Sequence, residues 1–310
     1  MASSIPLDTP FTSVTASALG IPDKALRAAC EAGELVRPSR GLYLPARLAD
    51  DPAVRAAAIA LVLPKGAALA RESAAWLMGV DVRPPSRWEA PPLLECLVPL
   101  GASRPRRPDL NAYISDLPDD GVVEVAGVAC TSAVRTALDL ARYRPRYLGL
   151  GAVDAMAHAG FVTVAELEEA ALPLRGHRFI RRAREVIDLC EPRTESMGES
   201  WSRLRVVEAG FPRPQVQISL CDETGREIFR IDMGFVEEQV GLEYDGVEHH
   251  LKTPEQRAHD DARRAEIRER FGWLVVAATK GDIFGRRPIL EGTLMEMLGL
   301  SFEVRRRVWA

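Results

Sequence analysis

The stretch "FRIDMGFVEEQVGLEYDG", residues 229–246, predicts two β-strands joined by a short turn. A short turn makes the two strands antiparallel, and successive side chains on a strand point to opposite faces of the sheet. Asp232 therefore lies opposite an apolar face, as do Glu243 and Asp245 on the second strand. The apolar face of the first strand comprises Phe229, Ile231, Met233 and Phe235. We expect the three carboxylates to converge on one side of the sheet.

Three carboxylates in one place allow two interpretations. Carboxylates that lie close together raise each other's pKa unless a cation neutralises them. Their hard oxygen ligands select Mg²⁺ or Mn²⁺, and such an ion polarises a phosphodiester and activates an attacking water, as in a nuclease. In the other interpretation the carboxylates face water on the solvated side of an antiparallel sheet, which requires no metal.

Residues beside the two strands extend the candidate site. Glu199 on the preceding helix would add a metal ligand, although Ser196 and Glu199 also have the spacing of a helix capping box. His249 and His250 directly follow the acidic strand, where a histidine can transfer a proton or hold a phosphate oxygen. The predicted catalytic residues are Asp232, Glu243, Asp245, His249 and His250, and the predicted metal ligands are Asp232, Glu243 and Glu199.

The elements around this stretch follow one another in the order αβββαβ, which a restriction-endonuclease-like core uses. The stretches "GFPRPQVQISL", "FRIDMGFVEEQVGLEYDGVEHH" and "GWLVVAATKGDIF" resemble a bacterial family related to the very-short-patch-repair endonuclease, in the PD-(D/E)xK superfamily. The resemblance implies that Asp232 binds metal, that Asp245 stands at a catalytic histidine's position, and that His250 matches a second histidine. In the wider superfamily's pattern, Asp232 and Glu243 are the D and the E.

The chain departs from that superfamily at one position. The superfamily has a lysine two residues after the glutamate, where this chain has Glu243-Tyr244-Asp245. Other residues could replace the lysine, namely Lys252, Lys280, His249, His250, Gln215 and Gln217. The core is therefore either an altered nuclease or a degenerate one that only binds.

The N-terminal stretch "FTSVTASALGIPDKALRAACEAGELVRPSRGLYLP", residues 11–45, predicts a helix, a turn, a second helix and a hairpin, which together make a winged helix-turn-helix. Its outward basic residues would meet DNA phosphates, and they are Lys24, Arg27, Arg37 and Arg40. The alternative is a small interaction module, because this shape serves both purposes. The stretch resembles the N-terminal winged helix of AbiEi-type antitoxins, which implies binding to operator DNA and a cognate toxin as partner.

The whole chain of 310 residues predicts an α/β (α+β) protein with a winged helix-turn-helix at 1–50, a mixed α/β linker domain at 51–193 and a restriction-endonuclease-like domain at 194–310. Its five cysteines form no CxxC pair, so we expect neither a disulfide framework nor a zinc site. No run is apolar for long enough to span a bilayer, and no signal peptide is recognisable. We therefore expect a cytoplasmic protein without a membrane partner.

The sequence supports two functions. The first is a DNA-binding endonuclease that hydrolyses phosphodiester bonds with Mg²⁺ or Mn²⁺, as a homodimer if it cuts both strands. The alternative is a non-catalytic AbiEi-type antitoxin or transcriptional regulator with a degenerate nuclease domain. The winged helix would deliver either protein to DNA.

Overall fold

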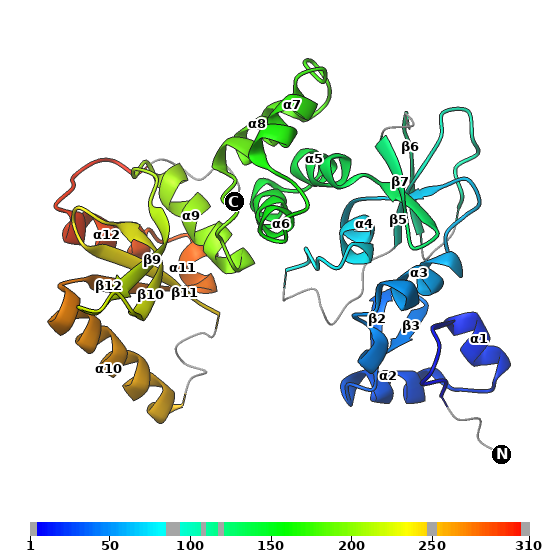
Figure 1. The fold of residues 1–310 in the computed structure, drawn as a ribbon, viewed down its shortest axis with the longest axis horizontal. Coiled ribbons are helices and arrows are strands. Elements are labelled where there is room, and N and C mark those ends of the chain that lie inside the picture. The colour runs from blue at the N-terminus through cyan, green and yellow to red at the C-terminus, as the bar shows by residue number, and fades with distance from the viewer. Residues whose placement is uncertain (1–4, 85–93, 107–109, 117–120, 247–252, 305–310) are drawn as a thin grey trace. The chain divides into compact units, whose positions relative to one another are not determined.

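The computed structural model describes residues 5–84, 94–106, 110–116, 121–246 and 253–304. Their helices and three β-sheets confirm the α/β (α+β) fold class (Figure 1). The chain divides into two compact units, which are described separately: Met1–Arg142 with Phe161–Ile180, and Tyr143–Gly160 with Arg181–Ala310. None of the helices in the described ranges is both long and apolar enough to cross a membrane.

The first unit begins with the winged helix expected from the sequence. Strand β1 (Phe11–Thr12) leads into α1 (Ser13–Ala18), α2 (Asp23–Glu31) and the hairpin of β2 (Leu35–Ser39) and β3 (Leu42–Pro45). The strands pair antiparallel in the order β1-β3-β2. A small core joins the helices to this sheet and consists of Phe11, Ala16, Ile21, Leu26, Ala29, Leu35 and Tyr43.

The rest of the first unit is built on a mixed five-stranded sheet of order β6-β5-β4-β8-β7. Its strands are β4 (Ala68–Leu69), β5 (Leu94–Val98), β6 (Leu110–Ile114), β7 (Val122–Val125) and β8 (Val128–Thr131). Its helices are the 3₁₀ turn η1 (Ala46–Leu48), α3 (Pro52–Ala60), α4 (Arg71–Leu77), α5 (Ala133–Tyr143) and α7 (Val164–Ala171). Leu42 and Leu44 of β3 are fully buried in the core of this sheet, whereas Tyr43 between them belongs to the winged-helix core. Strand β3 therefore serves two cores, one on each face.

The second unit contains the αβββαβ core expected at the C-terminal end of the chain. The core runs through α9 (Met197–Ala209), β9 (Gln215–Cys221), β10 (Glu227–Phe235), β11 (Val240–Asp245), α10 (Pro254–Phe271) and β12 (Leu274–Thr279). The sheet order is β12-β11-β10-β9, and only β11 and β12 pair in parallel. The unit also contains α6 (Arg146–His158), most of α8 (Ile180–Leu189), α11 (Lys280–Phe284) and α12 (Ile289–Leu298).

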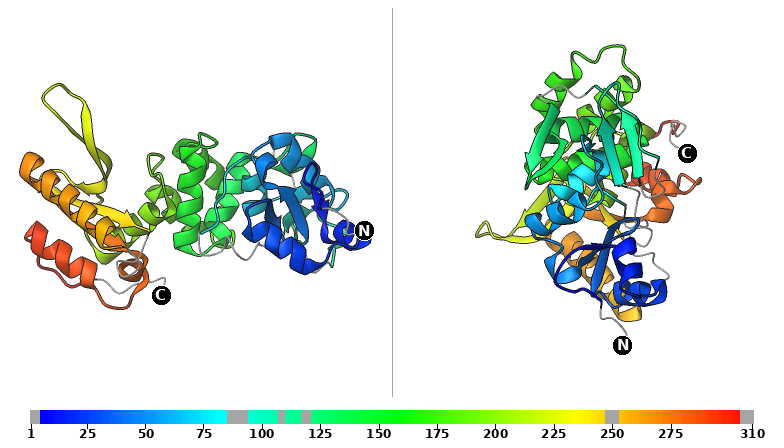
Figure 2. Two further views of the ribbon diagram at one scale, coloured as in Figure 1. Left: turned by 90° about the horizontal axis from the view of Figure 1, so that it is seen from below. Right: turned by 90° about the vertical axis from the view of Figure 1, so that its right-hand side faces the viewer.

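Helices cover both faces of this four-stranded sheet. Helices α9, α11 and α12 pack on one face in a cluster that includes Trp201, Leu242 and Leu294 (Figure 1). Helix α10 covers the other face through the fully buried Ile267, which packs with Trp273 (Figures 1 and 2). This arrangement explains why β11 begins with three consecutive buried residues instead of an alternating pattern.

Strand β10 does not present one continuous apolar face, so the prediction that its four apolar residues share a face is wrong. Phe229 and Ile231 pack with the α10 cluster, whereas Met233 and Phe235 pack with the α9 and α12 cluster. The change of face occurs opposite Gln217 of β9, whose φ of 52° is left-handed. A residue with such a φ interrupts the regular alternation of a strand, as in a β-bulge.

Candidate functional site

The exposed face of α2 carries two of the basic residues predicted to contact DNA. Lys24 and Arg27 are exposed, while Leu26 and Ala29 on the opposite side are buried in the winged-helix core. This division follows from the helical period of 3.6 residues. Within the described ranges, the Arg27 guanidinium makes no hydrogen bond or ion pair. Arg27 can therefore bind an anion without first breaking an ion pair.

The wing places the other two predicted residues beside this face. The Arg37 guanidinium lies 5.5 Å from the centre of the Tyr43 ring, a cation–π contact that holds the side chain along β2. Its Nε is buried and has no hydrogen-bond partner in the part of the chain that the structure describes. Arg40 is exposed in the turn between β2 and β3, where Gly41 takes a φ of 75° that glycine adopts readily.

An open groove of about 890 Å³ runs beside α2 and β2. The charged and aromatic residues that line it are Arg27, Glu31, Arg37, Tyr43, Asp50, Arg55, Trp76, Asp81 and Arg83. Arg55 pairs with Asp50 at 2.9 Å, and Arg83 donates to Asp81 at 2.8 Å, so these two arginines are neutralised locally. Arg27 and Arg37 have no such carboxylate partner among the described residues. The winged-helix side of the groove is therefore its cationic side.

Asp232 of β10 interacts electrostatically with both of the other predicted metal ligands, Glu199 of α9 and Glu243 of β11. We call these three residues the acidic pocket. Asp232 accepts a hydrogen bond from the backbone N–H of Tyr244 at 2.8 Å. Glu243 accepts two hydrogen bonds from Nη1 of Arg263, at 2.7 and 2.8 Å. Both carboxyls are therefore held by donors of the protein itself.

Glu199 is buried on α9 at the side of the pocket. Its Oε2 accepts hydrogen bonds from the Glu195 backbone N–H at 3.1 Å and from Nε2 of Gln217 at 3.0 Å. Ser196 caps the helix by accepting from the Glu199 N–H at 3.1 Å. The capping box predicted from Ser196 and Glu199 is thus half formed, because the glutamate reaches the N–H of Glu195 instead of that of Ser196.

Burial dominates the electrostatics of the acidic pocket. It raises the pKa of Glu199, Asp232 and Glu243 above their ordinary values. The charge of Asp232 raises the pKa of Glu199 and of Glu243 further, so Asp232 interacts with each of the two glutamates. Hydrogen bonds oppose this effect, from Tyr244 to Asp232 and from Arg263 to Glu243. Arg263 is the positively charged group that opposes the rise most strongly at both Asp232 and Glu243.

The remaining predicted site residues are less informative. Asp245 is half-buried at the end of β11, in register with Thr279 of β12. His249 and His250, and the substitute Lys252, lie outside the described residues. Among the residues that are described, no group of three histidine, cysteine, aspartate or glutamate side chains is arranged to hold a metal ion. The acidic pocket in this arrangement does not fit Mg²⁺ or Mn²⁺, and that cofactor stays a prediction.

Sequence reasoning missed Arg263, the main partner of Glu243. The signal was present in α10, because Ile267 is four residues further on and therefore lies on the same side of the helix. Ile267 is the buried residue of α10, so an arginine one turn earlier faces the sheet as well. What the sequence could not supply is the distance from α10 to Glu243, because that depends on how the helix crosses the sheet.

Two parts of the chain match family models of antitoxins. Residues 10–46 match a model described as a transcriptional regulator, AbiEi antitoxin, and residues 66–189 match the AbiEi antitoxin C-terminal domain. The first match supports the resemblance of the winged helix, but neither supports a relationship of the C-terminal core to the very-short-patch-repair endonuclease. Two uncharacterized proteins from strains of Mycobacterium tuberculosis are each 29% identical over 177 residues. The alignment covers 57% of this chain and 64% of each relative, which is less than two thirds of their length.

Proposed function

We propose that this protein is a DNA-binding regulator of the AbiEi antitoxin type, and that it contacts DNA through α2 and the wing. The observation that carries the proposal is the basic surface of the segment that matches the regulator model. Lys24 and Arg27 are exposed on α2, and Arg37 and Arg40 lie on the wing beside it. Such side chains bind phosphates by releasing condensed counterions, and a recognition helix reads bases in the major groove.

The local geometry favours α2 as the recognition helix. Lys24 lies in its first turn, and the residues of a recognition helix nearest its N-terminus contact base edges in helix-turn-helix proteins. Arg27 follows one turn later on the exposed side. Arg40 at the tip of the wing is positioned for the flanking phosphate backbone, which fixes orientation more than sequence preference.

A cognate toxin is the second proposed partner. The support is the pair of matches to AbiEi antitoxin models, at residues 10–46 and 66–189. Co-expression with the product of the adjacent gene, followed by a growth assay, tests this part. Relief of that product's toxicity by the full chain would support an antitoxin, and unchanged toxicity would contradict it.

Fluorescence anisotropy tests DNA binding by the full chain. We expect it to bind a duplex taken from upstream of its own gene more tightly than a shuffled duplex of the same length. The affinity for both should fall as salt rises. If neither duplex is bound at low salt, the proposed function fails.

The competing hypothesis is a divalent-metal-dependent DNA endonuclease. It rests on the αβββαβ order and on the proximity of Asp232 and Glu243. It predicts that the protein cleaves supercoiled, mismatched or single-stranded DNA with Mg²⁺ or Mn²⁺, and that Asp232→Ala and Glu243→Ala abolish this cleavage. If DNA stays intact while it is still bound, the regulator is favoured.

A further inference from the structure

The acidic pocket of the C-terminal core already contains a cation, the guanidinium of Arg263. One nitrogen of this group, Nη1, donates to both carboxylate oxygens of Glu243, at 2.7 and 2.8 Å. The other terminal nitrogen donates to the carbonyl of Arg230 in β10 at 3.1 Å. The guanidinium also lies 5.7 Å from the centre of the Phe229 ring. Arg263 thus contacts a carboxylate, a backbone carbonyl and an aromatic ring of the sheet at the same time.

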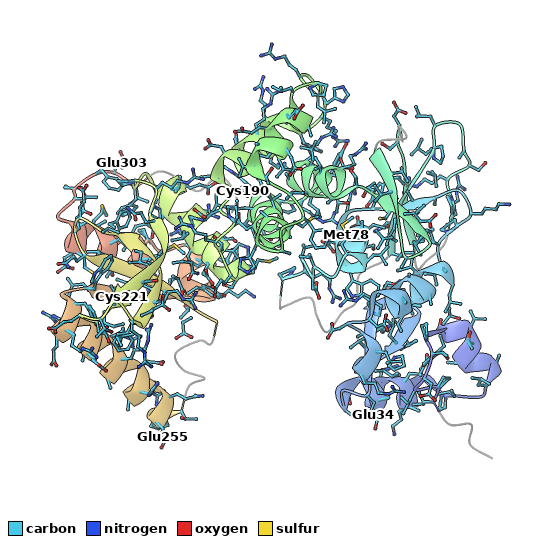
Figure 3. All side chains as sticks on the ribbon, viewed as in Figure 1. Glu34, Met78, Cys190, Cys221, Glu255 and Glu303 are labelled. Atoms are coloured by element: carbon cyan, nitrogen blue, oxygen red, sulfur yellow. The ribbon has the colours of Figure 1, made fainter. Side chains whose placement is uncertain are left out.

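The rest of α10 holds this arginine in place. Ile267, one turn further along the helix, is fully buried against Ile231, Leu220 and Trp273. Thr253 and Gln256 form a capping box that fixes the start of the helix. Glu255, labelled in Figure 3, marks this end of α10. Arg263 therefore belongs to a helix that is anchored on the sheet, and the sheet-facing position of its side chain follows from that anchoring.

A divalent cation and Arg263 would compete for the same oxygens. Mg²⁺ requires nearly octahedral oxygen coordination at about 2.0–2.1 Å, so a carboxylate ligand must turn an open oxygen toward it. Both oxygens of Glu243 accept hydrogen bonds from Nη1. One oxygen of each other carboxyl is also an acceptor: Oδ2 of Asp232 accepts from Tyr244, and Oε2 of Glu199 accepts from Glu195 and Gln217. An ion that coordinated Glu243 would therefore have to weaken or displace the hydrogen bonds from Arg263.

We propose that Arg263 is the permanent counter-charge of the acidic pocket, and that it takes the place of a divalent cation in this nuclease-like fold. A guanidinium stays charged at every physiological pH and needs no ligand exchange. The C-terminal core would then be folded and complete without metal. This inference goes beyond the proposed regulator, because it concerns a domain that begins after the last residue matched by the antitoxin models.

The test is a thermal-melting series on the full chain with and without Mn²⁺ or EDTA. Arg263→Gln removes the counter-charge. Arg270→Gln is the matched control on the same helix, because Arg270 is exposed and pairs with the exposed Glu266. We expect the wild type and the control to melt at the same temperature with Mn²⁺ as with EDTA. We expect Arg263→Gln to melt several degrees lower than both, because Glu243 loses its partner.

Two results would overturn the inference. One is a rise in the melting temperature of the wild type with Mn²⁺ that is absent in Glu243→Gln, which would identify a cation site. The other is an Arg263→Gln variant that melts at the same temperature as the Arg270→Gln control. If Arg263→Gln does not fold, the double variant Arg263→Gln with Glu243→Gln decides. Recovery of folding supports a paired counter-charge, and failure to recover contradicts it. None of these outcomes depends on DNA binding.

Discussion

Asp154 of α6 and Arg203 of α9 form an ion pair in which each side chain is only 1% exposed. The same carboxyl accepts hydrogen bonds from the Ser200 hydroxyl at 2.6 Å and from the Glu191 backbone N–H at 2.8 Å. Cys190, labelled in Figure 3, is buried next to this pair, and burial together with the Asp154 charge raises the pKa of its thiol to about 12. The pair joins a helix from the middle of the sequence to the first helix of the C-terminal core.

Loss of one partner of this pair should destabilise the second unit strongly. We expect Asp154→Ala to lower the free energy of unfolding by about 3–5 kcal/mol, because it leaves a buried guanidinium unpaired. The double variant Asp154→Leu with Arg203→Met should be much closer to the wild type, since it leaves no buried charge without a partner. Urea unfolding of the full chain measures both. If the two variants lost the same free energy of unfolding, the unpaired guanidinium would not be the cause of the destabilisation.

Glu208 should make the second unit less stable as the pH rises. Burial raises the pKa of this carboxyl, and Arg146 opposes the effect from 2.6 Å. A carboxyl whose pKa is raised in the folded state contributes to folding stability. This stabilisation is fully present below the ordinary pKa, about 4.3, and it is lost as the pH rises through the pKa of the folded state. The free energy of unfolding, measured by urea unfolding at each pH, should therefore fall less in Glu208→Gln than in the wild type between about pH 4 and pH 8. Glu185→Gln is the control, because Glu185 is exposed and lies further from Arg146.

Gly198 should not tolerate a methyl group. A Cβ at this position of α9 would lie 2.0 Å from two ring atoms of Tyr244, the residue after Glu243. We expect Gly198→Ala to lower the free energy of unfolding by about 1–3 kcal/mol or more, because the Tyr244 ring must move. Gly292→Ala is the matched control in α12, where a Cβ meets no atom within 4 Å. That control should gain about 0.5–1 kcal/mol from helix propensity. Thermal melting compares the two variants.

Arg27 and Arg37, which pair with no carboxylate among the described residues, should each contribute to DNA binding. We expect Arg27→Gln and Arg37→Gln to weaken binding several-fold and to reduce the slope of log affinity against log salt by about 0.9 for each phosphate that the variant no longer neutralises. Arg47→Gln is the control, because Arg47 is exposed but already pairs with Asp8. Anisotropy titrations at several salt concentrations measure the slopes. A slope unchanged in both groove variants would move the DNA site away from α2 and the wing.

Local patterns in the sequence predicted the parts of the fold that depend on neighbouring residues. The winged helix follows from the apolar residues that recur at helical spacing around Leu26 and Ala29, and from the turn at Gly41. The strands β10 and β11 follow from short apolar segments separated by a turn. Asp232 and Glu243 were therefore expected to lie close together, and the structure brings them to the same pocket.

Relationships between distant residues could not be predicted in this way. Strict alternation predicts that the apolar residues on either side of Asp232 share one face, whereas Ile231 and Met233 pack on opposite faces. Arg263 lies 20 residues after Glu243, and only the crossing of α10 over the sheet brings their side chains together. The electrostatics of the pocket depend on that contact, because Arg263 lowers the pKa of both Asp232 and Glu243.

The shared strand β3 ties the winged helix to the rest of the first unit. Leu42 and Leu44 are fully buried in the core of the five-stranded sheet, on the face opposite Tyr43. A fragment that stops at residue 50 would expose both leucines to water, which removes burial worth about 1.5–3 kcal/mol for each side chain. The winged helix is therefore not a detachable module, and a recombinant fragment used in crystallisation or in a hybrid repressor should keep the sheet that supports its wing.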